Sequence, residues 1–250
     1  MESKNIFKME MYKNRNDKPY LIVITILTVM AAIATFMTIG MTKGHIKSDG
    51  VLLVMLIMLI VFFIMGLSVF SLLYPFHLLN IDYKNKVISL IFASGVSREK
   101  YYFIKIGATI LCCSLAMLTI LFIPMLTFLV IYPEFFVEMM QQIIKSFSIA
   151  HILPVVLMTA FSVLAYYVTL TTSVIITKGK VAGIFLYFGF SFAVSTVSSG
   201  ITFPILMGVD IMGDSINIFN QYLNINTLFS VVQIIIFALI GLAVLKRQDL

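Results

Sequence analysis

The residues that could carry out chemistry in this sequence are few and widely spaced. Its three histidines, His45, His77 and His151, lie in different segments, so no two are placed as metal ligands or as an acid and a base. Cys112 and Cys113 are adjacent within an apolar run, where a disulfide framework or a metal site is not expected. The sequence therefore predicts no catalytic, cofactor or metal site in this chain.

A phosphate-binding loop is also missing from the sequence. No GxxxxGKS or GxxxxGKT pattern occurs, and Gly179-Lys180 lacks the upstream glycine that such a loop needs. We therefore expect that the chain is not an ATPase itself. If ATP drives its function, ATP and Mg²⁺ are bound by a separate subunit.

Regularly spaced polar residues occur in a late apolar segment. Ser191, Ser195 and Ser199 recur every four residues and Thr202 follows, so a helix here has one small, weakly polar face. One interpretation is a pore-lining stripe for an amphipathic substrate. The other is close packing against a second helix, which uses the same residue types. Pro204 follows the stripe, and we expect it to break the helix toward the outer surface.

The elements that must position these residues are membrane-spanning helices. Hydrophobic residues make up 61% of the chain and charged residues 11%, whereas charged residues are about a quarter of an ordinary soluble domain. The apolar runs are continuous and long enough for helices of about 20 residues, unlike the alternating strands of membrane barrels. The expected spans are 21–40, 51–74, 106–131, 152–176, 181–203 and 228–245. The predicted fold is all-α, a single membrane domain over residues 1–250 with six transmembrane helices.

The distribution of Lys and Arg predicts the orientation of these spans. With the N-terminus inside, the cytoplasmic segments hold fourteen Lys and Arg residues and the outer loops hold three. Positively charged loops stay on the cytoplasmic side, so both termini are expected there. Because the basic residues lie between apolar runs and not on one soluble face, we expect membrane lipids and no nucleic acid as partners.

Three connecting segments are informative beyond their charge. Residues 1–18 mix apolar residues with lysines and predict an interfacial N-terminal segment. Residues 204–226 are too long for a simple turn, and we expect a short re-entrant segment in the outer leaflet between spans five and six. Residues 82–105 form the longest cytoplasmic loop, in which apolar spacing predicts a short helix that stops at Gly95, with Ser97 capping the next helix. The apolar residues that indicate this short helix are Val87, Leu90 and Ile91.

Together these features resemble the permease subunit of the type-2 family of ABC exporters, and the resemblance covers nearly the whole chain. Residues 91–101, IFASGVSREKY, are similar to the family's coupling segment, in which a short helix precedes a Ser/Gly turn and basic residues. Residues 245–250, LKRQDL, are similar to the family's usual basic ending with an Asp. Both similarities lie in segments that we expect on the cytoplasmic side.

The resemblance implies a permease dimer, a homodimer or a heterodimer, bound to two copies of an ABC ATPase subunit. The short helix would dock in a groove of the ATPase, and facing first, second and fifth spans would form the pore. The residues that the resemblance assigns to ATPase coupling are Val87, Leu90, Ile91, Ser94, Gly95, Ser97 and Arg98.

The richness in Ile, Lys, Asn and Met is similar to permeases of low-GC Gram-positive bacteria, among which exporters of bacteriocins or phenol-soluble modulins are most similar in size and character. This resemblance implies export of an amphipathic, hydrophobic or lipid-like substrate, in the first place a peptide, across a bacterial cell membrane. Two alternatives remain open. One is a non-transporting immunity or sensor protein that binds a toxic peptide, and the other is a small secondary carrier.

Overall fold

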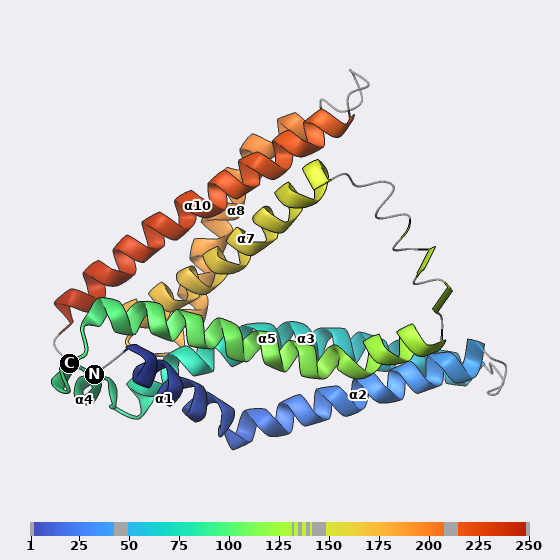
Figure 1. Ribbon diagram of the computed structural model, residues 1–250, viewed down its shortest axis with the longest axis horizontal. Coiled ribbons are helices and arrows are strands. Elements are labelled where there is room, and N and C mark those ends of the chain that lie inside the picture. The colour runs from blue at the N-terminus through green and yellow to red at the C-terminus, as the bar shows by residue number, and fades with distance from the viewer. Residues whose placement is uncertain are drawn as a thin grey trace. The chain divides into compact units, whose positions relative to one another are not determined.

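A computed structural model describes residues 3–42, 50–131, 133–134, 137–138, 141, 149–207 and 215–248. Eight α-helices have bounds within these residues and are labelled in Figure 1 where there is room. Their bounds are α1 (Ser3–Arg15), α2 (Lys18–Thr42), α3 (Gly50–Lys84), α4 (Ile88–Ala93), α5 (Arg98–Ile131), α7 (Ile149–Ile176), α8 (Ala182–Met207) and α10 (Ser215–Arg247).

Six of the helices, α2, α3, α5, α7, α8 and α10, are long and apolar enough to cross a membrane. The predicted all-α fold with six candidate spans is therefore confirmed. Many of their large apolar side chains are exposed in the isolated chain, as Leu118 and Phe192 illustrate. Such a surface suits hydrocarbon, because the helix satisfies its own backbone hydrogen bonds and presents only apolar side chains to lipid.

Several helices extend beyond the spans that the sequence predicts. α3 ends at Lys84 rather than at residue 74, α5 begins at Arg98 rather than at residue 106, and α10 begins at Ser215 rather than at residue 228. Hydropathy marks the apolar part of a helix, whereas the helical backbone hydrogen bonds continue through polar residues at either end. The predicted boundaries were therefore too short at these three ends.

The backbone of α8 continues through position 204 and ends at Met207. The break expected at Pro204 is therefore absent from the described backbone, because a proline removes one N–H donor and a membrane helix tolerates that loss. The predicted segment 204–226 includes the end of α8 and the first turns of α10. Residues 208–214 lie outside the described residues, and the re-entrant path stays a prediction.

The contacts within the chain divide it into two compact units. Unit 1 comprises Leu79–Ile106 and Gln142–Leu250 together with Met1, and unit 2 comprises Glu2–Leu78 and Gly107–Gln141. In unit 1, α7, α8 and α10 pack together, and α4 lies between the last turns of α3 and the first turns of α5 along the chain (Figure 1). The expected single membrane domain stays a prediction.

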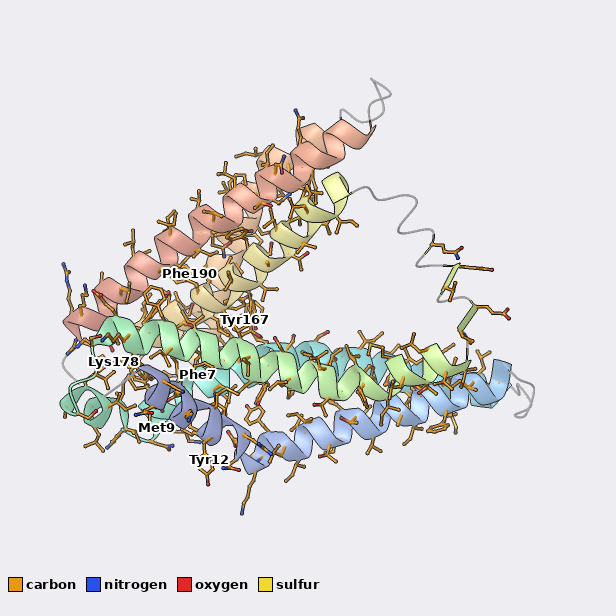
Figure 2. All side chains as sticks on the ribbon, viewed as in Figure 1. Phe7, Met9, Tyr12, Tyr167, Lys178 and Phe190 are labelled. Atoms are coloured by element: carbon orange, nitrogen blue, oxygen red, sulfur yellow. The ribbon has the colours of Figure 1, made fainter. Side chains whose placement is uncertain are left out.

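Unit 2 contains α1, α2 and the longer parts of α3 and α5. One face of α1 is buried through residues four apart, Ile6, Glu10 and Asn14. Met9 and Tyr12 are exposed and project from α1 in Figure 2. The segment 1–18 therefore contains a helix with an apolar side chain on its exposed surface, and its expected place at a membrane interface stays a prediction.

Candidate functional site

The short helix predicted in the loop 82–105 is present as α4, in unit 1. Its last carbonyls are satisfied by the turn that follows, since the backbone N–H of Ser94 donates to Leu90 and that of Gly95 donates to Phe92, both at 3.0 Å. Gly95 has φ +84°, a left-handed conformation that favours glycine at a helix end. The stop at Gly95 is therefore confirmed by its local geometry.

The cap that the sequence predicts at Ser97 is present, although the expected span began only at residue 106. The hydroxyl of Ser97 accepts a hydrogen bond from the backbone N–H of Lys100 at 3.4 Å, and the carbonyl of Ser97 accepts from Tyr101 at 3.0 Å. A serine in this position satisfies one of the N–H groups that a helix start leaves free. Ser97 therefore caps α5 and fixes where the loop ends.

Exposure separates the residues that the resemblance assigns to coupling. Leu90 is 68% exposed, and Val87, Ser94, Gly95 and Ser97 are also exposed. Ile91 is only 7% exposed, because it lies on the inner side of α4 together with Ile88. Ile91 therefore packs inside unit 1, whereas Leu90 is the most exposed large apolar side chain of α4. The coupling role of these residues stays a prediction.

A buried ion pair ties the end of α3 to the start of α5. Nζ of Lys105 lies 2.8 Å from Oδ2 of Asp82, and the Tyr101 hydroxyl donates to the same oxygen at 2.5 Å. Asp82 is 1% and Lys105 2% exposed. A buried charge is stable only when it is paired and hydrogen-bonded, so these three side chains hold the two ends of the α4 loop together.

Arg98, expected at the coupling surface, instead binds the end of α10. Its Nη1 donates to the carbonyl oxygens of Leu245 at 2.5 Å, Lys246 at 2.7 Å and Gln248 at 3.0 Å. The last carbonyls of a helix lack partners within the helix and carry partial negative charge, which a guanidinium satisfies. The two segments that carry the family resemblance, 91–101 and 245–250, are therefore in direct contact.

Gln248 extends this contact to α7 and α3. Its Nε2 donates to the carbonyl oxygen of Ile175 at 2.6 Å, and its Oε1 accepts from the Tyr83 hydroxyl at 3.1 Å. We call Asp82, Arg98, Tyr101, Lys105 and Gln248 the junction. The junction joins the ends of α3, α5, α7 and α10 around the loop that carries α4.

The turn between α7 and α8 lies against the same end of α3. Gly179 has φ +73°, and a Cβ at this position would collide with the Asn80 side chain and lie 2.6 Å from Cβ of Tyr83. Only glycine fits both the conformation and the space. The chain therefore returns from α7 to α8 in close contact with the last turns of α3.

A second candidate site is a cavity of about 240 Å³ among α7, α8 and α10. Nine of the twelve residues that line it are polar, although all three helices are candidate spans. The polar residues include Tyr166, Ser191, Ser195, Asn226, Ser230 and Gln233. Polar groups at membrane depth are costly unless they are paired or functional, so this cavity is a candidate binding site.

Only part of the predicted serine stripe lines this cavity. Ser191 and Ser195 line the polar cavity, whereas Ser199 and Thr202 do not. The Ser199 hydroxyl bonds to the carbonyl of Thr196 at 3.1 Å, and the Thr202 hydroxyl bonds to that of Ser198 at 2.9 Å. Both hydroxyls are thus bonded within their own helix, and whether the stripe from Ser191 to Thr202 lines a pore or packs against another helix stays a prediction.

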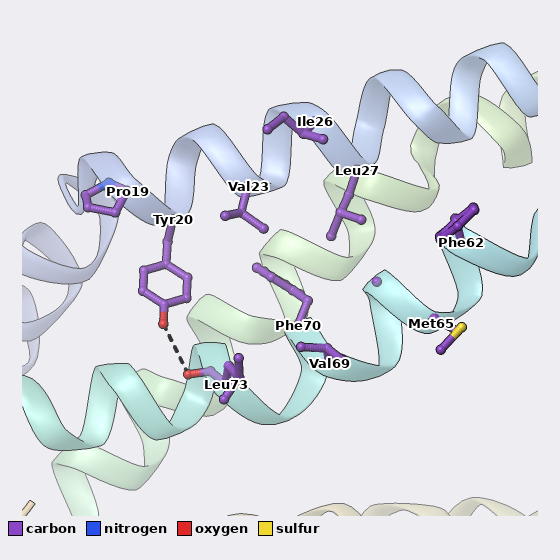
Figure 3. Close-up of a pocket in the computed structure, with 11 residues that line it drawn as sticks. Pro19, Tyr20, Val23, Ile26, Leu27, Phe62, Met65, Val69, Phe70 and Leu73 are labelled. Atoms are coloured by element: carbon purple, nitrogen blue, oxygen red, sulfur yellow. Dashed lines mark hydrogen bonds between the residues drawn. The ribbon is translucent and has the colours of Figure 1, made fainter. Parts of the chain in front are cut away.

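Unit 2 contains an apolar groove of about 670 Å³ between α2 and α3 (Figure 3). Its lining includes Leu27, Phe62 and Phe70, and the hydrogen bond drawn there runs from the Tyr20 hydroxyl to the carbonyl oxygen of Leu73 at 3.4 Å. The groove lies along two candidate spans. Nothing in its lining selects one apolar occupant over another.

Among the side chains that the structure describes, no three His, Cys, Asp or Glu residues come together as metal ligands. Nε2 of His77 lies 2.5 Å from Oδ2 of Asp17, and the His77 ring is tilted against that of Tyr20, with the ring centroids 4.4 Å apart. His45 and the side chain of His151 lie outside the described residues. His77 is therefore part of the packing of α3 against the start of α2.

Comparison with known proteins returns no match: no protein-family model, no curated protein and no solved structure corresponds to this chain.

Proposed function

We propose that this chain is the membrane-spanning permease subunit of an ATP-driven exporter in a bacterial cell membrane. The ATPase is a separate subunit present in two copies, and a second permease chain completes the complex. The substrate is an amphipathic molecule, in the first place a peptide. ATP and Mg²⁺ belong to the ATPase, and this chain supplies the membrane path and the surface that receives the ATPase.

The observation that carries the proposal is the exposed Leu90 on a helix that is fixed at both ends. α4 is held between the buried Asp82–Lys105 pair and the Arg98 contact with α10. A partner that binds Leu90 can thus move the ends of four helices, whereas a free loop would absorb the displacement. This arrangement suits transmission of motion from a soluble subunit to the membrane helices.

The proposed orientation is supported by the segments that the junction brings together. The basic residues of the α4 loop, of the α7–α8 turn and of the α10 end are separated by long stretches of sequence. Arg98, Gln248 and Gly179 connect these three segments at one end of unit 1. Three basic segments at one end of the helices are what the positive-inside rule requires of a cytoplasmic side.

The experiment that tests the function is purification of the intact chain from membranes of its own host. We expect a subunit with a GxxxxGKS or GxxxxGKT loop to copurify, and Mg²⁺-dependent ATP hydrolysis to rise when an amphipathic helical peptide of Leu and Lys is added. Leu90→Asp should abolish copurification, because a charge cannot occupy an apolar groove. Asn85→Asp is the matched control, since it adds the same charge at an exposed site in the same loop.

The result also separates the two alternatives. Peptide binding without a copurified ATPase indicates an immunity or sensor protein that acts by binding alone. Uptake or release of a peptide in vesicles that contain only this chain, driven by an ion gradient, indicates a secondary carrier. Either result contradicts the exporter proposal.

A further inference from the structure

The polar cavity of unit 1 adjoins a second, apolar cavity. The apolar cavity has a volume of about 260 Å³, lies between α8 and α10, and is lined by Val197, Val232 and Ile236 among others. Both cavities are lined by Val194, Phe229 and Gln233. Each alone is smaller than the roughly 300 to 1,000 Å³ of a ligand pocket, whereas the two together fall within that range.

Hydrogen-bonding capacity remains free on the polar side. No described residue bonds to the Ser195 hydroxyl, which lines the cavity. The hydroxyl of the neighbouring Thr196, in contrast, donates to the carbonyl oxygen of Phe192 in its own helix at 2.8 Å. Nε2 of Gln233 donates to the Thr169 hydroxyl at 2.9 Å, and no described group donates to its Oε1. The cavity therefore offers a ligand one hydroxyl and one free carbonyl acceptor.

The remaining polar side chains form a fixed frame around these two groups. The Ser162 and Ser230 hydroxyls lie 3.2 Å apart across α7 and α10, and the Ser198 hydroxyl donates to Oδ1 of Asn226 at 3.3 Å across α8 and α10. Tyr166 and Tyr187 meet edge to face, with ring centroids 5.5 Å apart. The frame joins three helices, so the cavity is part of the packed unit.

The charge of the lining limits the kind of ligand. The residues that line the two cavities include no Asp, Glu, Lys, Arg or His. An ionised head group would lie at membrane depth without a counter-ion, which is costly. An uncharged amide has its donor and its acceptor on different atoms, so that it can reach both the Ser195 hydroxyl and Oε1 of Gln233.

We infer that the two cavities form one site for an amphipathic molecule, with an uncharged amide at Ser195 and Gln233 and an apolar tail against Val197, Val232 and Ile236. The inference deepens the proposed export function by naming where the substrate binds and which head group is selected. Binding at this site requires no ATPase, so it can be tested separately. The site lies within one chain, among α7, α8 and α10.

The chain contains no tryptophan, which allows a site-specific optical test. Phe229→Trp places a single indole on a residue that both cavities share. The full chain in nanodiscs is titrated with decanamide brominated on its tail, with the equally brominated decanoate at pH 8, and with a brominated monoacylglycerol. Bromine quenches indole fluorescence only at short range. If Phe229→Trp does not fold, Val232→Trp in the apolar cavity serves as the reporter.

We expect saturable quenching by the amide, with an apparent affinity at least about tenfold above that for the carboxylate. Ser195→Ala in the reporter chain should weaken amide binding about threefold to tenfold, the effect of one hydrogen bond. Ser199→Ala should leave it unchanged, because Ser199 bonds to its own helix and lines neither cavity. Phe188→Trp, also outside both cavities, reports simple partition into the lipid.

Three results would overturn the inference. Quenching that rises linearly and equally in the Phe229→Trp and Phe188→Trp chains would indicate partition into the lipid. Equal binding of amide and carboxylate, or tighter binding of the monoacylglycerol than of the amide, would contradict selection of an amide. An unchanged affinity in Ser195→Ala overturns the proposed role of that hydroxyl. If the amide binds but no ATPase copurifies, the site stands and the export function fails. If an ATPase copurifies but no probe saturates, the export function stands and this site fails.

Discussion

The junction and the polar cavity of unit 1 are built from opposite kinds of interaction. At the junction, the charged groups of Asp82 and Lys105 are buried, that of Arg98 is half-buried, and their described contacts lie within the protein. In the cavity the polar groups are uncharged, and Ser195 and one end of Gln233 have free hydrogen-bonding capacity. The first region is closed to ligands and the second is open to one.

This difference indicates a division of tasks within one compact unit. Paired, buried charges fix geometry, because any displacement exposes or separates them at high cost. Uncharged groups with free capacity can exchange one partner for another at little cost. We therefore expect substitutions at the junction to lower stability and coupling, and substitutions in the cavity to change binding while stability is kept.

The largest effect is expected for Lys105→Met, which leaves the Asp82 carboxylate buried without its cation. We expect a loss of about 3 to 5 kcal/mol in the free energy of unfolding. The loss is measured as a lower midpoint of thermal unfolding in detergent, followed by size-exclusion chromatography. Asp82→Leu combined with Lys105→Met removes both charges and should recover much of the loss. A double variant as unstable as Lys105→Met would show that the pair does not act through charge.

A smaller effect is expected for Arg98→Gln, which removes the charge that satisfies the last carbonyls of α10. Hydrogen bonds to charged groups contribute about 1.5 to 3 kcal/mol, and the loss should fall in that range. Hydrogen exchange should increase at residues 244–248, and less elsewhere. Arg247→Gln is the control, because Arg247 is exposed at the same helix end. Equal exchange in the two variants would contradict the assigned role of Arg98.

Gly179→Ala tests the contact of the α7–α8 turn with α3. The left-handed conformation alone costs about 1 to 2 kcal/mol for a residue with a Cβ, and the Asn80 side chain must also move. The thermal midpoint should fall. Gly189→Ala in α8 should leave it equal or higher, since no atom lies within 4 Å of the added Cβ and alanine favours a helix. A similar fall of the thermal midpoint in both variants would show that the close fit of the turn against α3 does not contribute to stability.

The smallest effect is expected for Glu99→Gln. Glu99 pairs with Lys246 at 2.5 Å beside Arg98, but both side chains are 57% exposed. Water and salt screen such a pair, so the thermal midpoint should not change measurably at 0.15 M salt. A clear fall of the thermal midpoint would show that this exposed ion pair beside the junction stabilises the protein as much as the buried contacts do.

The six spans could be predicted from the sequence, because continuous apolar runs are a local signal that needs no knowledge of packing. The helix α4, its stop at Gly95 and the cap at Ser97 could also be predicted, because apolar spacing, a glycine and a serine are likewise local signals. The ends of α3, α5 and α10 could not be placed well, since polar residues extend a helix as readily as they end it. Hydropathy does not indicate where the backbone hydrogen bonds of a helix end.

The junction could not be predicted, because its contacts join residues far apart in the chain. Arg98 and Leu245 are separated by 147 positions, and no periodicity relates them. The polar cavity was predicted only in part, from the serines of α8. A further signal was present in α10, where Asn226, Ser230 and Gln233 are spaced four and three apart and so share one helix face.

Photocross-linking at Leu90 tests the central claim most directly, because it asks what this one side chain touches in its native membrane. A photoreactive benzoylphenylalanine replaces Leu90 in one chain and Leu118, an exposed residue on the apolar part of α5, in another. We predict that illumination links position 90 to a subunit with a phosphate-binding loop, and that the same adduct is absent at position 118. Adducts at position 90 with lipid alone, in membranes that contain the complete complex, would contradict the account.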